Sequence, residues 1–262
     1  MVAPRCGYVV ETLEPKRTRI QLCGRLVVEL DGRRLDEALP GRQGRLLFGY
    51  LAANRGTPVR RDVLLDVLWP QGAPVAPDAA LRSLVSKLRR VLGEERIEGR
   101  STLRLVLPAD SRIDVETAIR NADDAESAIA LGRHEQAWLP ARIALSVARR
   151  EFMADYEGEW IERRRRELAE VRLSALECIA QIGLALGSTE LPAAERAARS
   201  LIELAPLRES GYQLLMETLE ASSNLGEALV AYDRLRCVLR DELGTVPGRE
   251  IQAVHERLLG KA

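Results

Sequence analysis

The segment from residue 78 to residue 92 holds the densest group of side chains that could do chemistry. Its apolar residues recur at helical spacing; they are Leu81, Leu84, Val85, Leu88 and Leu92. That spacing predicts a helix with one face in a core. The other face carries Arg82, Ser83, Ser86, Lys87, Arg89 and Arg90. These residue types can hydrogen-bond base edges in the major groove of double-stranded DNA, and arginine neutralises phosphates. We therefore expect a DNA-reading helix; the alternative is a surface helix that is merely basic.

Further arginines occupy places from which they could support this helix. They are Arg42 and Arg45, Arg60 and Arg61, and Arg100 and Arg104. The first two pairs begin predicted helices, where free backbone N–H groups and the helix dipole favour a phosphate. The third pair falls in a predicted hairpin after the basic helix. We expect Arg42, Arg60, Arg61, Arg100 and Arg104 to contact DNA, and a solvated charge remains the alternative for each.

Catalytic and metal-binding patterns are missing from the sequence. It contains no GxSxG, Walker-type, GxGxxG or HExxH motif. His134 and His255 fall on separate predicted helices. The cysteines, at positions 6, 23, 178 and 237, form no CxxC pair, whereas metal ligands must cluster. We expect no catalytic residues, no metal, no cofactor and no enzymatic activity, with the thiols reduced.

Hydropathy and charge set two further expectations. No stretch of about 18 apolar residues occurs, and the N-terminus lacks the apolar segment of a signal peptide, so we expect a cytoplasmic protein without membrane contact. Residues 1–108 carry 19 Lys and Arg against 12 Asp and Glu, whereas residues 109–262 carry 20 against 27. A basic half joined to an acidic half predicts that the first half meets a polyanion.

The elements that position the basic helix are predicted from turn residues and periodicity. Two short strands are expected in Arg19–Leu30, and the Asp31-Gly32 turn leads to a third strand at Arg33–Leu35. Three helices are expected next, at Gly41 to Asn54, Arg60 to Trp69 and Pro77 to Leu92. The inner face of the second is predicted to comprise Val63, Leu64, Val67 and Leu68. A hairpin over Arg96–Leu107 completes the plan of a winged helix-turn-helix preceded by a small sheet.

The rest of the chain is predicted to be helical. The expected helices are Asp114 to Leu131, Glu135 to Arg150, Glu157 to Leu186, and three or four shorter ones between Leu191 and Leu259. Ala194 and Ala228 lie 34 residues apart, as do Ala198 and Tyr232, which is the period of a tetratricopeptide repeat. We expect a mainly α fold. It divides into an extension over residues 1–18, a winged-helix domain over 19–108, and tetratricopeptide-like helices over 111–262; the alternative for the last is an unrelated helical bundle.

Two stretches of sequence resemble a known family. The run GRQGRLLFGYLAANRGTPVRRDVLLDVLWP, followed by ALRSLVSKLRRVLG, resembles the antibiotic regulatory protein (SARP) type of transcriptional activator. Residues 111–262, including the ending Asp241-Glu242-Leu243-Gly244 and Pro247, are similar to that family's bacterial transcriptional activation domain. The resemblance implies an OmpR-type winged helix, binding to direct DNA repeats near promoters as a homodimer, and recruitment of RNA polymerase. A protein-binding adaptor, dominated by its helical repeats, is the other function that we consider.

Overall fold

The computed structural model describes residues 18–72 and 74–261, and it divides the chain into two compact units. The first unit contains the chain up to Leu22 together with Leu26–Ile113, and the second contains Cys23–Arg25 together with Asp114–Ala262. The expected extension over residues 1–18 lies outside the described residues except for Thr18, as does Cys6.

A small sheet opens the first unit. Its strands are β1 (Arg19–Gln21), β2 (Val27–Leu30), β3 (Arg33–Arg34) and β7 (Arg112–Ile113), in the order β3-β2-β1-β7. The predicted turn joins β2 to β3, with positive φ angles of 51° at Asp31 and 78° at Gly32. β7, which the sequence did not predict, pairs in parallel with β1 and places Ile113 opposite Ile20. The first unit therefore extends to Ile113, beyond the expected boundary at residue 108.

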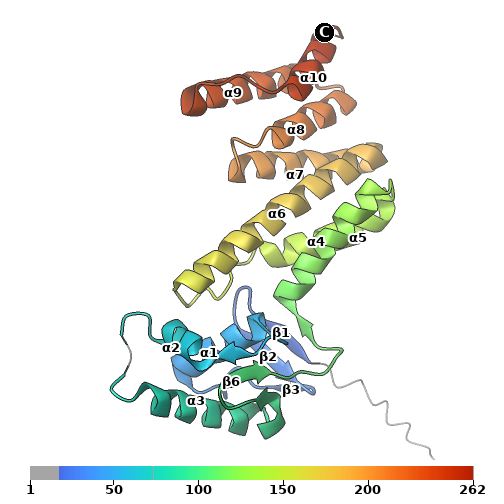
Figure 1. Cartoon of the computed structure of the whole chain (residues 1–262). Coiled ribbons are helices and arrows are strands. Elements are labelled where there is room, and N and C mark those ends of the chain that lie inside the picture. The colour runs from blue at the N-terminus through green and yellow to red at the C-terminus, as the bar shows by residue number, and fades with distance from the viewer. Residues whose placement is uncertain (1–17, 73, 262) are drawn as a thin grey trace, which may run out of the picture. The chain divides into compact units, whose positions relative to one another are not determined.

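Three helices follow the sheet (Figure 1): α1 (Gly41–Ala53), α2 (Arg61–Leu68) and α3 (Pro77–Leu92). α1 packs against both of the others. α3 begins at a proline, whose missing N–H costs nothing in a first turn, and ends at Gly93, whose φ of 111° suits glycine. The expected stripe of α3 is buried at Leu81, Val85, Leu88 and Leu92.

The inner face of α2 is narrower than predicted. Leu64 and Leu68 are buried, whereas Val63 is 38% exposed, so its assignment to the inner face is wrong. A helix of only two turns buries a narrow stripe, which here consists of Leu64 and Leu68. Val63 lies one residue before Leu64 and therefore points away from that stripe.

A second sheet completes the first unit. It has the order β4-β6-β5, with β4 at Val59–Arg60, β6 at Thr102–Leu105 and β5 at Ile97–Glu98. The hairpin of β5 and β6 is the predicted wing, while β4 was not predicted. Strands, three helices and a terminal hairpin make this unit the expected winged helix.

The second unit is a stack of antiparallel helices (Figure 1). They are α4 (Asp114–Ala130), α5 (His134–Ala148), α6 (Glu159–Leu186), α7 (Leu191–Leu204), α8 (Glu209–Ala221), α9 (Leu225–Leu243) and α10 (Arg249–Leu259). Each helix from α4 to α9 packs against the next, as in tetratricopeptide-like repeats. Three of the four predicted repeat positions, Ala194, Ala198 and Ala228, are fully buried, and Tyr232 stacks on His255 with ring centroids 3.8 Å apart.

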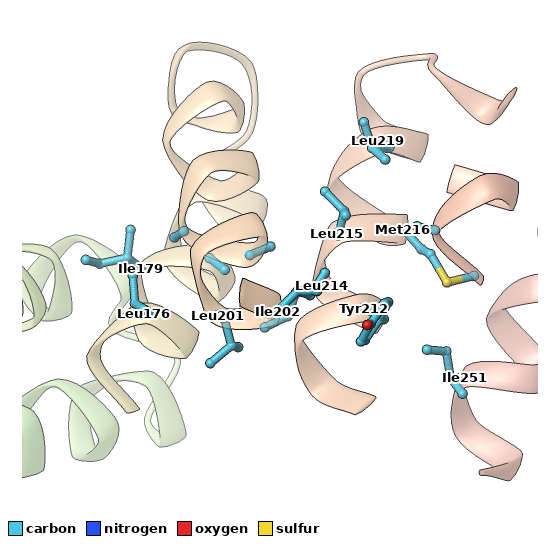
Figure 2. Close-up of a cluster of buried hydrophobic side chains, with 14 of the residues drawn as sticks. Leu176, Ile179, Leu201, Ile202, Tyr212, Leu214, Leu215, Met216, Leu219 and Ile251 are labelled. Atoms are coloured by element: carbon cyan, nitrogen blue, oxygen red, sulfur yellow. The ribbon is translucent and has the colours of Figure 1, made fainter. Parts of the chain in front are cut away.

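A continuous apolar core runs along this stack (Figure 2). Leu176 and Ile179 of α6, Leu201 and Ile202 of α7, and Tyr212 of α8 follow one another in the close-up. Small residues allow the helices to approach closely. A Cβ on Gly183 would lie 2.9 Å from the Ala194 Cβ, so only glycine fits there. The core thus links every repeat to its neighbours.

A short loop between β1 and β2 belongs to the second unit. The Cys23 backbone N–H donates to Asp114 Oδ2 (2.9 Å), and the Gly24 N–H donates to the Glu151 carbonyl (2.7 Å). Cys23 also forms an isolated antiparallel bridge with Phe152. The Asp114 side chain at the start of α4 and the Glu151 carbonyl in the α5–α6 connection therefore accept hydrogen bonds from residues far earlier in the chain.

Candidate nucleic-acid interface

The polar face of α3 is exposed along its length. Its exposed side chains are those of Arg82, Ser83, Ser86, Lys87 and Arg90. Among the described residues, none of the three cations on this face has an acidic partner. Asp78, the one acidic residue of the helix, lies in the first turn beside Arg61 of α2, with Arg61 Nε 3.6 Å from its Oδ1. The helix thus presents uncompensated positive charge and two hydroxyl groups to solvent.

Arg89 differs from the other predicted contact residues of α3. Its Nε and Nη2 donate to the Ile97 carbonyl at 2.9 and 2.8 Å, and Nη2 also donates to the Gly99 carbonyl at 3.1 Å. These bonds attach α3 to β5 and to the turn of the wing. Because its Nε and Nη2 are bonded to two carbonyls of the wing, Arg89 holds the wing against α3, and we do not count it among the candidate DNA contacts.

The arginines at the start of α2 serve two different purposes. Arg60 pairs with Asp62, whose carboxylate in the first turn competes with any phosphate there. Arg61 is half-buried and donates to the carbonyls of Arg100 and Asp78, at 3.3 and 3.5 Å. It therefore connects α2 to both α3 and the wing.

The remaining predicted contact residues lie at the edges of the unit. Arg100 is exposed in the turn between β5 and β6, and Arg42 is exposed in the first turn of α1. Arg104 pairs across the hairpin with Glu98, Nη2 to Oε2 2.6 Å. Arg45 is half-buried on α1. The tip of the wing thus adds one exposed cation, Arg100, to those of α3.

Cysteine and histidine side chains form no cluster among the described residues. Cys23 and Cys178 are buried and Cys237 is exposed, and all three are free. Burial raises the pKa of Cys23, and it raises the pKa of Cys178 to about 11, so neither is a reactive thiolate. The described residues include no group of three or more His, Cys, Asp or Glu that could hold a metal ion. Nor does any helix in residues 18–72 and 74–261 combine the length and apolarity needed to cross a bilayer.

A family model covers most of the second unit. The bacterial transcriptional activator domain matches residues 113–259, which begin at the end of β7 and end with α10. A winged helix joined to such a domain defines a class of bacterial transcriptional regulator. The chain belongs to the bacterial transcriptional activator domain family, as a regulator of the SARP type.

Its curated relatives are regulators. The transcriptional regulatory protein EmbR of Mycobacterium tuberculosis is 30% identical over 252 residues, which cover 93% of this chain and 64% of EmbR. The regulatory protein AfsR of Streptomyces coelicolor is 31% identical over 256 residues, which cover 97% of this chain and 25% of AfsR. The chain therefore spans about two thirds of the one relative and a quarter of the other.

A solved structure supports the same fold. The structure of M. tuberculosis EmbR in complex with a low-affinity phosphopeptide superposes with a TM-score of 0.82 at 26% identity. The match covers 94% of this chain and 66% of the EmbR chain. The winged-helix unit and the helical-repeat unit are thus both features of a known regulator.

Proposed function

We propose that this protein is a transcriptional activator that binds specific sites in double-stranded DNA through α3. One observation carries the proposal: the exposed face of α3 joins Arg82, Lys87 and Arg90 to two serines, without an acidic partner among the described residues. A helix of this width fits the major groove, where arginine and serine can hydrogen-bond base edges. Arg100 at the tip of the wing supplies a further contact to the DNA backbone.

In this proposal Arg42, Arg60 and Arg104 contact the DNA backbone at the edges of the interface. Arg60 and Arg104 already have carboxylate partners, so DNA must compete with Asp62 and Glu98. A phosphate can replace these exposed carboxylate partners, because exposed ion pairs contribute little to stability. Arg61 supports the interface by holding α2, α3 and the wing together.

The second unit has the protein-contact role in this proposal. Two protomers bind direct repeats near a promoter, and residues 114–262 contribute contacts to the other protomer or to RNA polymerase. The names of EmbR and AfsR as regulatory proteins support this division, as does the acidic excess after residue 108. An acidic surface repels DNA and suits a protein partner.

The test begins with selection of bound sites from a random DNA pool by the full chain. Affinity for the selected site is then measured at two salt concentrations for the wild type, Arg82→Ala and Arg90→Ala. Loss of one phosphate contact lowers the log–log salt slope by about 1, and loss of a base contact costs about 1–3 kcal/mol at one base pair.

Arg163→Ala is the matched control, because Arg163 is exposed on α6 in the second unit. We expect its affinity to equal that of the wild type. Unchanged binding by both α3 variants would remove α3 from the interface. Failure to select any DNA site would favour the adaptor function instead.

A further inference from the structure

Three neighbouring helices of the second unit each turn a stripe of residues toward a common groove. α6 packs between α5 and α7 (Figure 1). On α5 the stripe is Trp138, Arg142 and Leu145, and Arg149 directly after the helix continues it, at intervals of four, three and four residues. On α7 it includes Ala193, Arg196, Ala197 and Ser200, spaced in the same helical way. These spacings place each set on one side of its helix.

The groove between these stripes consists of two adjoining hollows. One has a volume of about 520 Å³ and a floor that includes Leu145 of α5 and Ile179 of α6. The other has a volume of about 310 Å³ and lies over α6 near Leu168. Arg149 lines both, so the two hollows adjoin at this residue. Their sizes are those of ligand-binding sites.

Arginines surround this apolar floor, and four of them have no acidic partner within the part of the chain that the structure describes. Arg142, Arg149 and Arg196 are exposed, and the Nε of Arg172 is buried without a hydrogen-bond partner among the described residues. Arg142 makes a cation–π contact with Trp138, in which the guanidinium carbon lies 5.9 Å from the centroid of the ring. The groove is therefore both positively charged and apolar.

Several arginines elsewhere in the same unit pair with carboxylates, although Arg163 and Arg166 of α6 have no such partner among the described residues. Arg199 contacts Glu195 and Glu227, Arg208 contacts Glu170 and Glu177, and Arg257 contacts Glu220, all within 3.4 Å. The part of the chain that forms this unit has an excess of acidic residues, so carboxylates are in good supply. In the groove only Glu151 and Glu190 line the hollows, and Glu151 is paired with Arg165 at 3.0 Å. The exposed arginines of the groove are therefore available to carboxylates from outside the unit.

We propose that this groove binds an acidic segment of a protein partner that carries at least one large apolar side chain. The carboxylates of the segment pair with Arg142, Arg149 and Arg196, and its apolar side chain covers the floor beside Trp138. Clusters of arginine recognise acidic motifs in this way, and the concave face of stacked helices suits an extended segment.

DNA is a poorer occupant for this groove than an acidic protein segment. A duplex has no apolar side chain to cover Leu145 and Ile179, and the excess of acidic residues after position 108 disfavours a polyanion near this unit. The inference deepens the protein-contact part of the proposed function and rests on it. It does not depend on α3, because peptide binding is measured in the absence of DNA.

The experiment uses the full chain and a fluorescein-labelled synthetic peptide in which glutamates alternate with leucine and phenylalanine. A second peptide has glutamine at every glutamate position. We expect the wild type to bind the acidic peptide and not the glutamine peptide. Arg142→Gln combined with Arg196→Gln should weaken binding about tenfold, because two charge-assisted contacts are lost.

Arg163→Gln combined with Arg166→Gln is the matched control, since both residues are exposed on α6 and line neither hollow. It changes the net charge equally and should leave peptide affinity unchanged. Equal weakening by both double variants, equal binding of the two peptides, or no binding at all would overturn the proposal.

The groove variant is also titrated with the selected DNA site. A parallel loss of DNA affinity would show that the groove contacts DNA, and unchanged DNA affinity would leave the α3 proposal standing by itself.

Discussion

Arg89 and Arg90 are adjacent in α3 and share a chemistry, yet the structure gives them separate roles. Arg90 is exposed and takes part in the proposed DNA contact, whereas Arg89 is half-buried and donates three hydrogen bonds to the Ile97 and Gly99 carbonyls. The two substitutions to alanine should therefore differ in which property they change.

We expect Arg89→Ala to lower the free energy of unfolding of the first unit by about 1–2 kcal/mol, because charged donors make the stronger hydrogen bonds. Arg90→Ala should change it by less than about 0.5 kcal/mol, as is usual for surface substitutions. Denaturant unfolding measures both, and limited proteolysis of the hairpin detects its release from α3. Equal stability of the two variants would show that Arg89 does not hold the wing.

Sequence patterns could identify the face of Arg89 but not its partners. The apolar stripe of α3 left Arg82, Arg89 and Arg90 all outside the core, and nothing in the local sequence separates them. The separation comes from the hairpin, which packs beside one side of the helix and brings the carbonyls of Ile97 and Gly99 within reach. The groove arginines of the second unit were missed for a similar reason. Arg142, Arg172 and Arg196 stand on three helices, and only packing brings them to one surface.

At the scale of elements, one carboxylate of α8 connects that helix to the C-terminal end of α10. Glu220 accepts hydrogen bonds from Arg257 (2.8 Å) and Lys261 (2.7 Å), at the end of α10 and just beyond it. These bonds hold the pKa of Glu220 below its usual value near 4.5. A carboxyl group whose pKa is lower in the folded state stabilises the fold above its unfolded pKa. That contribution is lost as the pH falls through the folded pKa.

Glu220→Gln should therefore lower the stability of the second unit by about 0.5–1 kcal/mol at neutral pH, a figure discounted for solvent screening. The difference from the wild type should disappear as the pH falls through the folded-state pKa of Glu220, which lies below 4.5, because the wild-type carboxyl then also becomes protonated. Thermal unfolding across this pH range is the measurement. Glu203→Gln, at an exposed position on α7, serves as control. A difference that persists at low pH would assign the effect to packing.

The predicted elements succeeded where glycine, proline or strong periodicity marked them. Pro77 and Gly93 delimit α3 in the structure as they did in the sequence, and the helices of the second unit begin and end within a few residues of their predicted bounds. β4 and β7 were missed, because strands of two residues carry no period. Their partners β6 and β1 lie far away in the chain, so local sequence holds no trace of the pairing.

At the scale of the whole molecule, the proposed function predicts that the two units can be separated experimentally. A fragment that ends at Ile113 should occupy the selected site, although more weakly than the full chain, since protomers joined by contacts gain effective concentration. It should fail to activate transcription. Footprinting and a reporter assay, read at matched occupancy, measure the two properties.

The position of the cut matters for this test. A fragment ending at Asp110 would lack β7 and so expose Ile20, which is fully buried beside Ile113. It serves as a control for misfolding. If the fragment ending at Ile113 still activates at matched occupancy, the helical unit is not the activating surface. Another surface of the first unit would then be the better candidate for contact with RNA polymerase.

The pairing of β1 with β7 also has a consequence for folding during synthesis on the ribosome. The first unit cannot complete its sheet until Ile113 has left the exit tunnel, so its earliest strand must wait for its latest one. The loop at Cys23 waits longer still, because its acceptor on Asp114 lies 91 residues downstream. The helical stack is different, since α4 to α9 pack mainly against their immediate neighbours and can add one helix at a time. We therefore expect the nascent chain to be most vulnerable to proteases and aggregation before Ile113 and Asp114 emerge.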